Sequence, residues 1–158
     1  MDFGKRFMEA YESVMRGTFN RLQEEIKGSE GHVLEEVETF VSGFRTKSRV
    51  YNPLLVMHLD GFETEVEAFD EFKYVFYINF ISIVKDLDYD ELGARIRAQG
   101  IVEAARSLIL NEWQELFGDD VRDVRPDSIG DSGLKIEEND KYGALSRLRV
   151  EMYIGNVY

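Results

Sequence analysis

The segment Ala144-Leu145-Ser146-Arg147-Leu148-Arg149-Val150-Glu151-Met152-Tyr153-Ile154 decides the fold, because its polarity alternates. On one side lie small or apolar residues, namely Ala144, Ser146, Leu148, Val150, Met152 and Ile154. On the other side lie the charged residues Arg147, Arg149 and Glu151. A period of two is typical of a β-strand with one buried face. We therefore predict a strand here, with its apolar face in the core.

A second strand is predicted over residues 72–84, and both of its faces are apolar. One face carries Phe72, Tyr74, Phe76, Ile78 and Phe80, and the other carries Val75, Tyr77, Ile81 and Ile83. An antiparallel strand that faces water on one side normally keeps that side polar. Both faces of this strand must therefore be covered, by helices on both sides or by a second subunit on one side.

Two long helices are predicted from apolar residues at helical spacing. The first runs from about Phe3 to Lys27, contains the weak helix former Gly17, and ends at Gly28-Ser29-Glu30-Gly31. The second opens with the acidic run Asp86 to Glu91, which suits the positive end of a helix dipole. It continues to about residue 117 and stops at Phe117-Gly118.

The other segments give weaker patterns. Residues 33–44 fit a short helix or a strand, and we favour the helix. Residues 54–59 read as a strand after Asn52-Pro53, and Asp60-Gly61 reads as a turn. Residues 62–70 read as an exposed strand edge or a long loop. Short strands are also predicted at 121–125 and 134–136, with a polar turn at 137–141.

These segments together predict one α+β domain over residues 1–158. It has a mostly antiparallel sheet, flanked by a long N-terminal helix and a long central helix. No internal repeat, low-complexity tract or linker divides the chain.

Composition limits the classes of function. The formal net charge is −12, from 31 acidic and 19 basic side chains, so the chain should repel nucleic acid unless its cations cluster. Such an excess suits a salt-loving host and equally suits an ordinary acidic protein. The absence of cysteine excludes disulfides and thiolate chemistry. No apolar run is long enough to predict a transmembrane helix, and the first residues do not resemble a signal peptide.

The sequence gives only weak signals for a metal site. His32 lies in a Gly-rich turn and His58 in a predicted strand, so a metal site or a histidine base is possible, but a structural histidine is the commoner case. The acidic stretch 119–131 invites a calcium interpretation, although it lacks the spacing of an EF-hand loop. A solvated acidic loop is the alternative.

Other charged groups also cluster along the chain. The carboxylate clusters are Glu35/Glu36/Glu38, Glu63/Glu65/Glu67 and Asp86/Asp88/Asp90, and nothing in the sequence pairs them with a nucleophile. The cations Arg45, Lys47, Arg49, Arg147 and Arg149 could form a patch for an acidic partner or nucleic acid, or form salt bridges between subunits. We assign no catalytic, cofactor-binding or metal-binding residue and expect no enzymatic activity.

Three passages resemble the tail terminator and tail-completion proteins of long-tailed viruses, which join the tail tube to the neck of the head. Tyr51-Asn52-Pro53-Leu54-Leu55-Val56-Met57 is similar to the proline-led first strand of that family. Residues 74–84 resemble its long second strand. Residues 121–126, a variable loop and residues 145–154 resemble its ending. The family runs from an N-terminal helix through a strand pair and a helix to closing strands.

The resemblance implies a structural virion protein, without a cofactor, that forms a homo-oligomeric, hexameric ring at the head–tail junction. Its expected partners are the tail tube protein, the neck or connector proteins and, transiently, the DNA passing through its channel. No membrane partner is expected, and assembly would take place in the host cytoplasm. A ring subunit should bury Val75, Tyr77 and Ile81 only in the assembly or under its own helices.

Two other classes of function remain open. One is a head-completion or adaptor protein of the same particle. The other is a small acidic cellular α+β enzyme or interaction domain. An enzyme would need a pocket between strand 72–84 and helix 90–117, and His58, Asn79 and Tyr77 are its candidate polar groups.

Overall fold

The computed structural model describes residues 2–28, 31–43, 52–68, 71–85, 90–128, 137–138 and 141–155. In these residues the chain forms two long helices, one short 3-10 helix and a six-stranded sheet. The elements in chain order are α1 (Phe3–Gly28), η1 (Val33–Glu36), β1 (Thr39–Ser42), β2 (Leu54–Ala68), β3 (Glu71–Lys85), α2 (Glu91–Leu116), β4 (Val121–Asp127), β5 (Glu137–Glu138) and β6 (Lys141–Gly155). The predicted single α+β fold is confirmed.

The sheet has the strand order β1-β2-β3-β6-β4, with the short β5 paired to the start of β6. The β1–β2 pair is parallel and every other neighbouring pair is antiparallel. The predicted closing strand β6 lies in the middle of the sheet, between β3 and β4. It pairs with β3 from Lys141 to Gly155 without interruption. The sequence segment with the clearest alternation therefore holds the sheet together.

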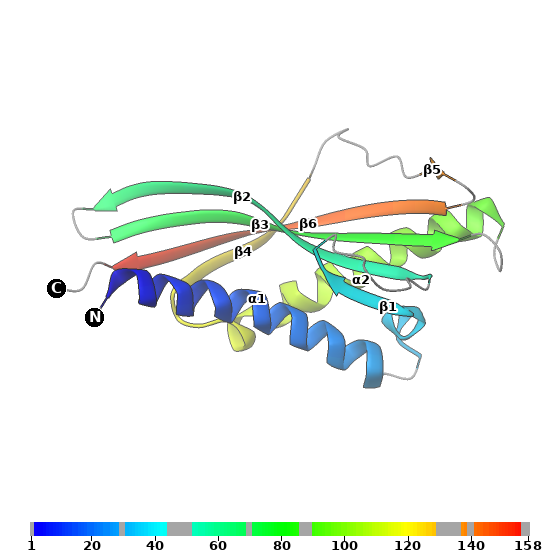
Figure 1. The fold of residues 1–158 in the computed structure, drawn as a ribbon, viewed down its shortest axis with the longest axis horizontal. Coiled ribbons are helices and arrows are strands. Elements are labelled where there is room, and N and C mark those ends of the chain that lie inside the picture. Colours follow the sequence, from blue (N-terminus) through cyan, green and yellow to red (C-terminus); the bar gives the residue numbers. More distant parts are fainter. Residues whose placement is uncertain are drawn as a thin grey trace.

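Both long helices pack on the same side of the sheet, which we call the helix face (Figure 1). The apolar side of β6 lies there, and Leu148, Val150 and Met152 are fully buried. Phe76 and Phe80 of β3 belong to the same core. These assignments confirm the predicted inward face of residues 144–154, because each apolar residue of β6 pairs with an inward residue of β3.

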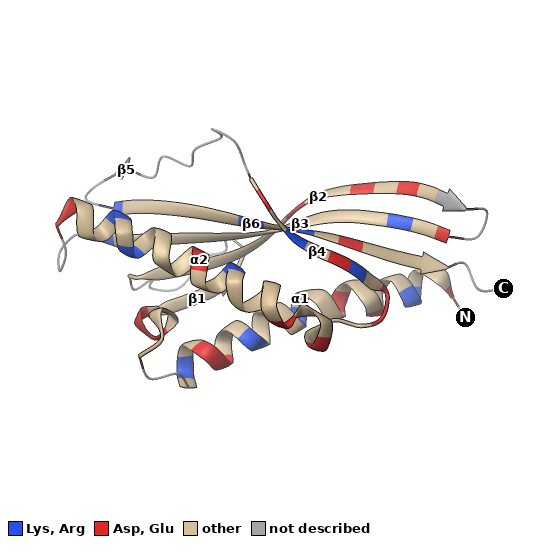
Figure 2. Ribbon diagram, turned by 180° about the vertical axis from the view of Figure 1, so that it is seen from behind, with Lys and Arg blue, Asp and Glu red and all other residues tan. Residues whose placement is uncertain are grey.

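The opposite side of the sheet, which we call the open face, has neither long helix on it (Figure 2). Val75 and Ile81 point to this side and are each only 2% exposed. Side chains on the neighbouring strands cover them, with Glu151 beside Val75 and Leu145 beside Ile81. The expectation of burial only under a second subunit or under helices is therefore wrong for Val75 and Ile81, because side chains of the same sheet cover both in the single chain. Tyr77 is only partly buried.

Two local expectations are also wrong. Residues 33–44 do not form one helix, since the short helix η1 is followed by strand β1, which pairs with β2 through Thr39 to Ser42. Asp60-Gly61 is not a turn, because β2 runs through it as a β-bulge. Gly61 has a φ of +60° and is the extra residue between Asp60, which is opposite Tyr77, and Phe62, which is opposite Phe76. The acidic segment that follows is strand to Ala68, which confirms its interpretation as a strand edge.

The helix boundaries agree well with the sequence. α1 ends at Gly28 and α2 ends at Leu116, with Phe117 as its C-cap. α2 begins at Glu91 because the Asp90 side chain accepts a hydrogen bond from the Gly93 N–H. Residues 86–89 and the strand predicted at 134–136 lie outside the described residues.

Gly17 explains how α1 approaches the end of α2. A Cβ atom at this position would lie 3.1 Å from the Leu116 carbonyl oxygen. A side chain at position 17 would therefore crowd the end of α2, which the glycine avoids.

Candidate functional site: the charged half of the open face

Charged side chains cover one half of the open face, and apolar side chains cover the other. The apolar half is a small cluster of Leu54, Val56 and Ile81, with Val41, Ile83 and Leu145 packed against it. The charged half is built from β3, β6, β4 and the bulged part of β2. It contains both arginines that the sequence placed opposite the apolar side of β6.

Arg147 is held on four sides. Its Nε donates to Asn79 Oδ1 at 2.8 Å, and its Nη2 donates to Asp60 Oδ2 at 3.0 Å. Asp127 lies 3.8 Å from its Nη1, and the guanidinium lies over the Tyr77 ring at 4.5 Å from the centroid. Only 17% of the Arg147 side chain is exposed. Strands β2, β3, β4 and β6 are therefore linked through one guanidinium.

Glu151 is the anionic centre of the same surface. Its Oε1 accepts hydrogen bonds from Arg149 and from Arg125 Nη2, and it lies 3.6 Å from Lys73 Nζ. Its side chain is 11% exposed. Three cations from three strands thus surround one carboxylate, which compensates for the cost of removing its charge from water.

The electrostatics of this group follow from the contacts. Burial raises the pKa of Glu151, but the hydrogen bond from Arg149 and the charges of Arg149, Lys73 and Arg125 outweigh it, and the pKa is lowered from its ordinary value of 4.5. The hydrogen bond to Glu151 raises the pKa of Arg149 in turn. Both groups are therefore held in their charged forms at neutral pH.

The lowered pKa of Glu151 predicts a contribution to pH-dependent stability. The contribution is fully present above the ordinary pKa of 4.5 and is lost as the pH falls through the lower folded value, because protonation removes the charge that the three cations require. We expect Glu151→Gln to be less stable than the wild type at pH 7, with a difference that shrinks below pH 4.5. Urea unfolding at both pH values measures this difference.

The matched control for this prediction is Glu115→Gln, which changes an exposed carboxylate at the end of α2. Its difference from the wild type should be small at both pH values. A Glu151→Gln difference that stays constant or grows towards low pH would contradict the assigned role of the carboxylate.

The sequence-predicted cation patch is only partly described. Arg147 and Arg149 form ion pairs within the chain, whereas Arg45, Lys47 and Arg49 lie outside the described residues. In the charged half of the open face, each arginine has at least one carboxylate partner. We call this surface the charged platform. Its carboxylates pair with its arginines, so it offers phosphate groups no large excess of positive charge.

Tyr77, Asn79 and His58 do not line a pocket against α2. Tyr77 and Asn79 stand opposite Arg149 and Arg147 on the open face, and His58 is opposite Asn79 on the same side. The expected enzyme pocket between β3 and α2 is not formed by these residues, because side chains alternate along a strand and these three point away from the helices. They belong to the charged platform or to its border.

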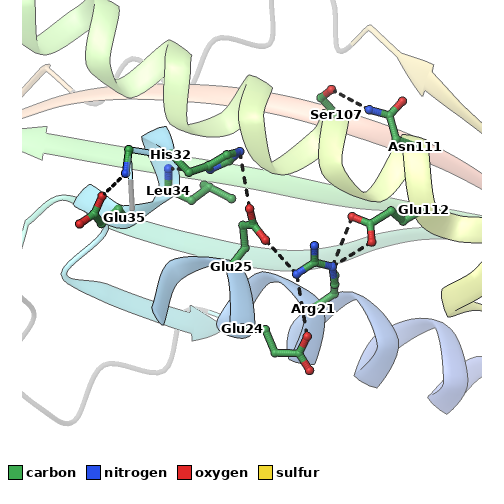
Figure 3. A network of polar contacts seen from close by, with 10 residues as sticks. Arg21, Glu24, Glu25, His32, Leu34, Glu35, Ser107, Asn111 and Glu112 are labelled. Atoms are coloured by element: carbon green, nitrogen blue, oxygen red, sulfur yellow. Dashed lines mark hydrogen bonds and ion pairs between the residues drawn. The ribbon is translucent and has the colours of Figure 1, made fainter. Parts of the chain in front are cut away.

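The other histidine has a structural role (Figure 3). The Leu34 N–H donates to His32 Nδ1 at 3.2 Å, which makes His32 the N-cap of η1. Its Nε2 lies 3.9 Å from Glu25, which also pairs with Arg21 at 2.9 Å. Arg21 donates to Glu112 of α2 at 3.0 Å, so this network ties η1 to both long helices.

Several carboxylates of the acidic clusters form hydrogen bonds or ion pairs within the described part of the chain. Glu35 accepts a hydrogen bond from the Gly31 N–H at 2.7 Å, and Glu36 pairs with Arg97 at 2.8 Å. In the stretch 119–131, the acidic residues with described ion pairs have arginine partners: Asp120 with Arg6, Asp123 with Arg125, and Asp127 with Arg147. Residues 129–131 of that stretch, Asp86, Asp88 and the Glu67 side chain lie outside the described part.

One hollow lies between α1 and the edge formed by β1 and β2. Its volume is about 300 Å³, and its lining comprises Glu12, Met15, Arg16, Phe19, Asn20, Ser42 and Met57. The two charged residues of the lining, Glu12 and Arg16, pair with each other across one helical turn. This hollow therefore shows no convergent set of polar groups of the kind a catalytic site requires.

Sequence reasoning missed Lys73, Asp60 and Tyr153 as parts of the platform. Tyr153 lies beneath the Arg122 guanidinium, 4.3 Å from the ring centroid. The signal was present in the alternation of β6, since Tyr153 is two residues from Glu151 on the same side. The pairing of β6 with β3 and β4, which brings the partners together, is not readable from one sequence.

A scan of the chain against models of known protein families found no match, and a search of curated proteins found none. Across the described helices, none is long and apolar enough to cross a membrane. Nor do the described residues contain a group of three or more side chains suited to hold a metal ion. The function is therefore inferred from the architecture and from the surfaces described above.

Proposed function

We propose that the chain is a structural subunit of the head–tail junction of a long-tailed virus, either a tail terminator or a tail-completion protein. In this role six copies form a ring that caps the tail tube, joins it to the neck and lets the genome pass. The subunit carries no catalytic centre. It would be found in the virion after assembly in the host cytoplasm.

The observation that carries the proposal is the order of the elements. The elements α1, β2–β3, α2, β4 and β6 come in the order that the resemblance implies: an N-terminal helix, a long strand pair, a second helix and closing strands. The chain adds η1 and β1 between α1 and β2, and the short β5 before β6. The three passages that carry the resemblance contain strand residues, and β2 starts at Leu54 directly after Pro53, although β1 precedes it as the first strand of the chain.

The charge of the molecule is compatible with a channel through which DNA passes. The net charge of −12 repels phosphate, so a genome would slide past the subunit without being held. The arginines of the open face do not alter this, because carboxylates of the same sheet neutralise them.

Electron microscopy of the purified chain in negative stain tests the proposal. We expect closed rings with a central opening at high protein concentration. Compact single subunits at every concentration, with no closed particle, would contradict the proposed role.

A further inference from the structure

Two strand edges of the sheet are open in the described part of the chain. On one side, β1 pairs only with Leu54 to Met57 of β2, and the last bond is the Gly43 N–H to the Met57 carbonyl at 2.8 Å. Beyond it, the outer edge of β2 has no strand partner among the described residues. On the other side, β4 is the last strand of the sheet. Unpaired edges of this kind readily accept another strand.

The open part of β2 is acidic on one side and apolar on the other. We call Phe62–Val66 the acidic edge. Glu63 and Glu65 point to the open face and are exposed. Phe62 and Val66 point to the helix face and are 46% and 70% exposed, although Phe62 also packs on Phe7 with ring centroids 5.6 Å apart. A strand placed here would gain apolar contacts on one side and meet carboxylates on the other.

The open edge of β4 carries two exposed arginines, with the 39% exposed carboxylate of Asp123 between them in the sequence. We call Val121–Arg125 the basic edge. Its Arg122 and Arg125 side chains are 56% and 55% exposed, while Val121 and Val124 belong to the core on the helix face. Arg122 pairs with Glu71, and Arg125 with Asp123 and Glu151, but a guanidinium has five N–H donors, so both retain donors for a further carboxylate. Figure 2 shows acidic positions along β2 and both basic and acidic positions along β4.

The strand directions allow the two edges to meet. β2 is antiparallel to β3, β3 to β6, and β6 to β4, so β2 and β4 run in opposite directions. A copy that continues the sheet would therefore place its β4 antiparallel to β2. We propose that the acidic edge of one subunit pairs with the basic edge of a second copy, so that the sheets continue from subunit to subunit.

The charges on the strand edges disfavour the alternative contact, in which the acidic edges of two copies pair with each other. A two-fold contact through β2 would place Glu63 and Glu65 near the same carboxylates of the partner, and like charges on facing strands are destabilising. Contact between two different edges is heterologous, and its repetition gives a ring when the rotation between neighbouring copies closes. The inference rests on the proposed ring and identifies the strands that form its subunit interface.

Charge reversal on each edge tests the inference. One variant carries Glu63→Arg and Glu65→Arg, and the other carries Arg122→Glu and Arg125→Glu. We expect each variant alone to associate at least about tenfold more weakly than the wild type in sedimentation experiments. An equal mixture of the two should recover wild-type association, because each reversed edge then meets an edge of opposite charge. Circular dichroism establishes that each variant is folded.

Reversal of Glu24 and Glu115, two exposed carboxylates on the long helices, is the matched control and should leave association unchanged. If the variants form wild-type rings, or if the mixture shows no recovery, the edge pairing is overturned while the ring proposal stands. If the wild type is monomeric throughout, both are overturned.

Cysteine cross-linking tests the same edge pairing without charge reversal, and it applies if a charge-reversed variant fails to fold. The chain has no native cysteine, so Glu63→Cys combined with Arg125→Cys introduces the only thiols. We expect a short thiol cross-linker to give a ladder of covalent oligomers. A ladder no stronger than that of Glu24→Cys with Glu115→Cys would overturn the pairing.

Discussion

Val150→Asp should unfold the domain. Val150 is fully buried on the helix face of β6, between Phe76 of β3 and Val124 of β4. A carboxylate at this position has no partner within the core, so we expect a loss of more than about 4 kcal/mol, which approaches the whole stability of a small domain. Far-ultraviolet circular dichroism with urea titration measures the loss.

The control for this substitution is Val66→Asp, the same chemical change on a residue that is 70% exposed in the same sheet. It should cost less than about 1 kcal/mol, since the carboxylate stays in water. A folded Val150→Asp variant with wild-type stability would show that the inward face of β6 is assigned wrongly.

Gly61→Val should produce the second large loss. Gly61 has a φ of +60°, and a Cβ atom there would lie 2.8 Å from Tyr77 Cδ2. A β-branched residue is strained in this backbone conformation and would displace the ring on which Arg147 lies, so we expect a cost of about 3 kcal/mol or more.

Deletion of Gly61 should be much better tolerated than its substitution. The glycine is the extra residue of the bulge, so its removal leaves Asp60 opposite Tyr77 and Phe62 opposite Phe76, as in the present register. Urea titration of the two variants compares them directly. A deletion variant less stable than Gly61→Val would contradict the register assigned around the bulge.

The sequence predicted the elements whose periodicity is long and undisturbed. The helices α1 and α2 and the strands β3 and β6 were recognisable because apolar residues recur over many positions. The bulge in β2 was predicted as a turn, because an Asp-Gly pair is typical of hairpin turns and a glycine with positive φ is also typical of β-bulges. The segment 33–44 changes from a 3-10 helix to a strand within a few residues, which is too short for either period to emerge.

The charged platform was predictable only in outline. Alternation in β6 placed Arg147, Arg149 and Glu151 on one side, but their partners Asp60, Lys73 and Arg125 come from three other strands. The order of those strands depends on tertiary pairing, which a local pattern does not encode. For the same reason the sequence suggested helices or a second subunit over Val75 and Ile81, where long side chains of the neighbouring strands provide the cover.

The platform and the open edges suit a subunit whose role is to hold others in place. Ion pairs that link four strands stiffen the sheet, and a stiff sheet fixes the direction in which its two edges point. A ring requires such a fixed angle between neighbouring copies, because an interface with a variable angle does not close.

Native mass spectrometry of the purified chain, at low and at high salt, tests the central claim most directly. The proposed role predicts a closed particle of six copies, together with smaller species that convert to it as the protein concentration rises. A mass that corresponds to one chain at both salt concentrations, and at every protein concentration, would contradict the account of this protein as a ring subunit.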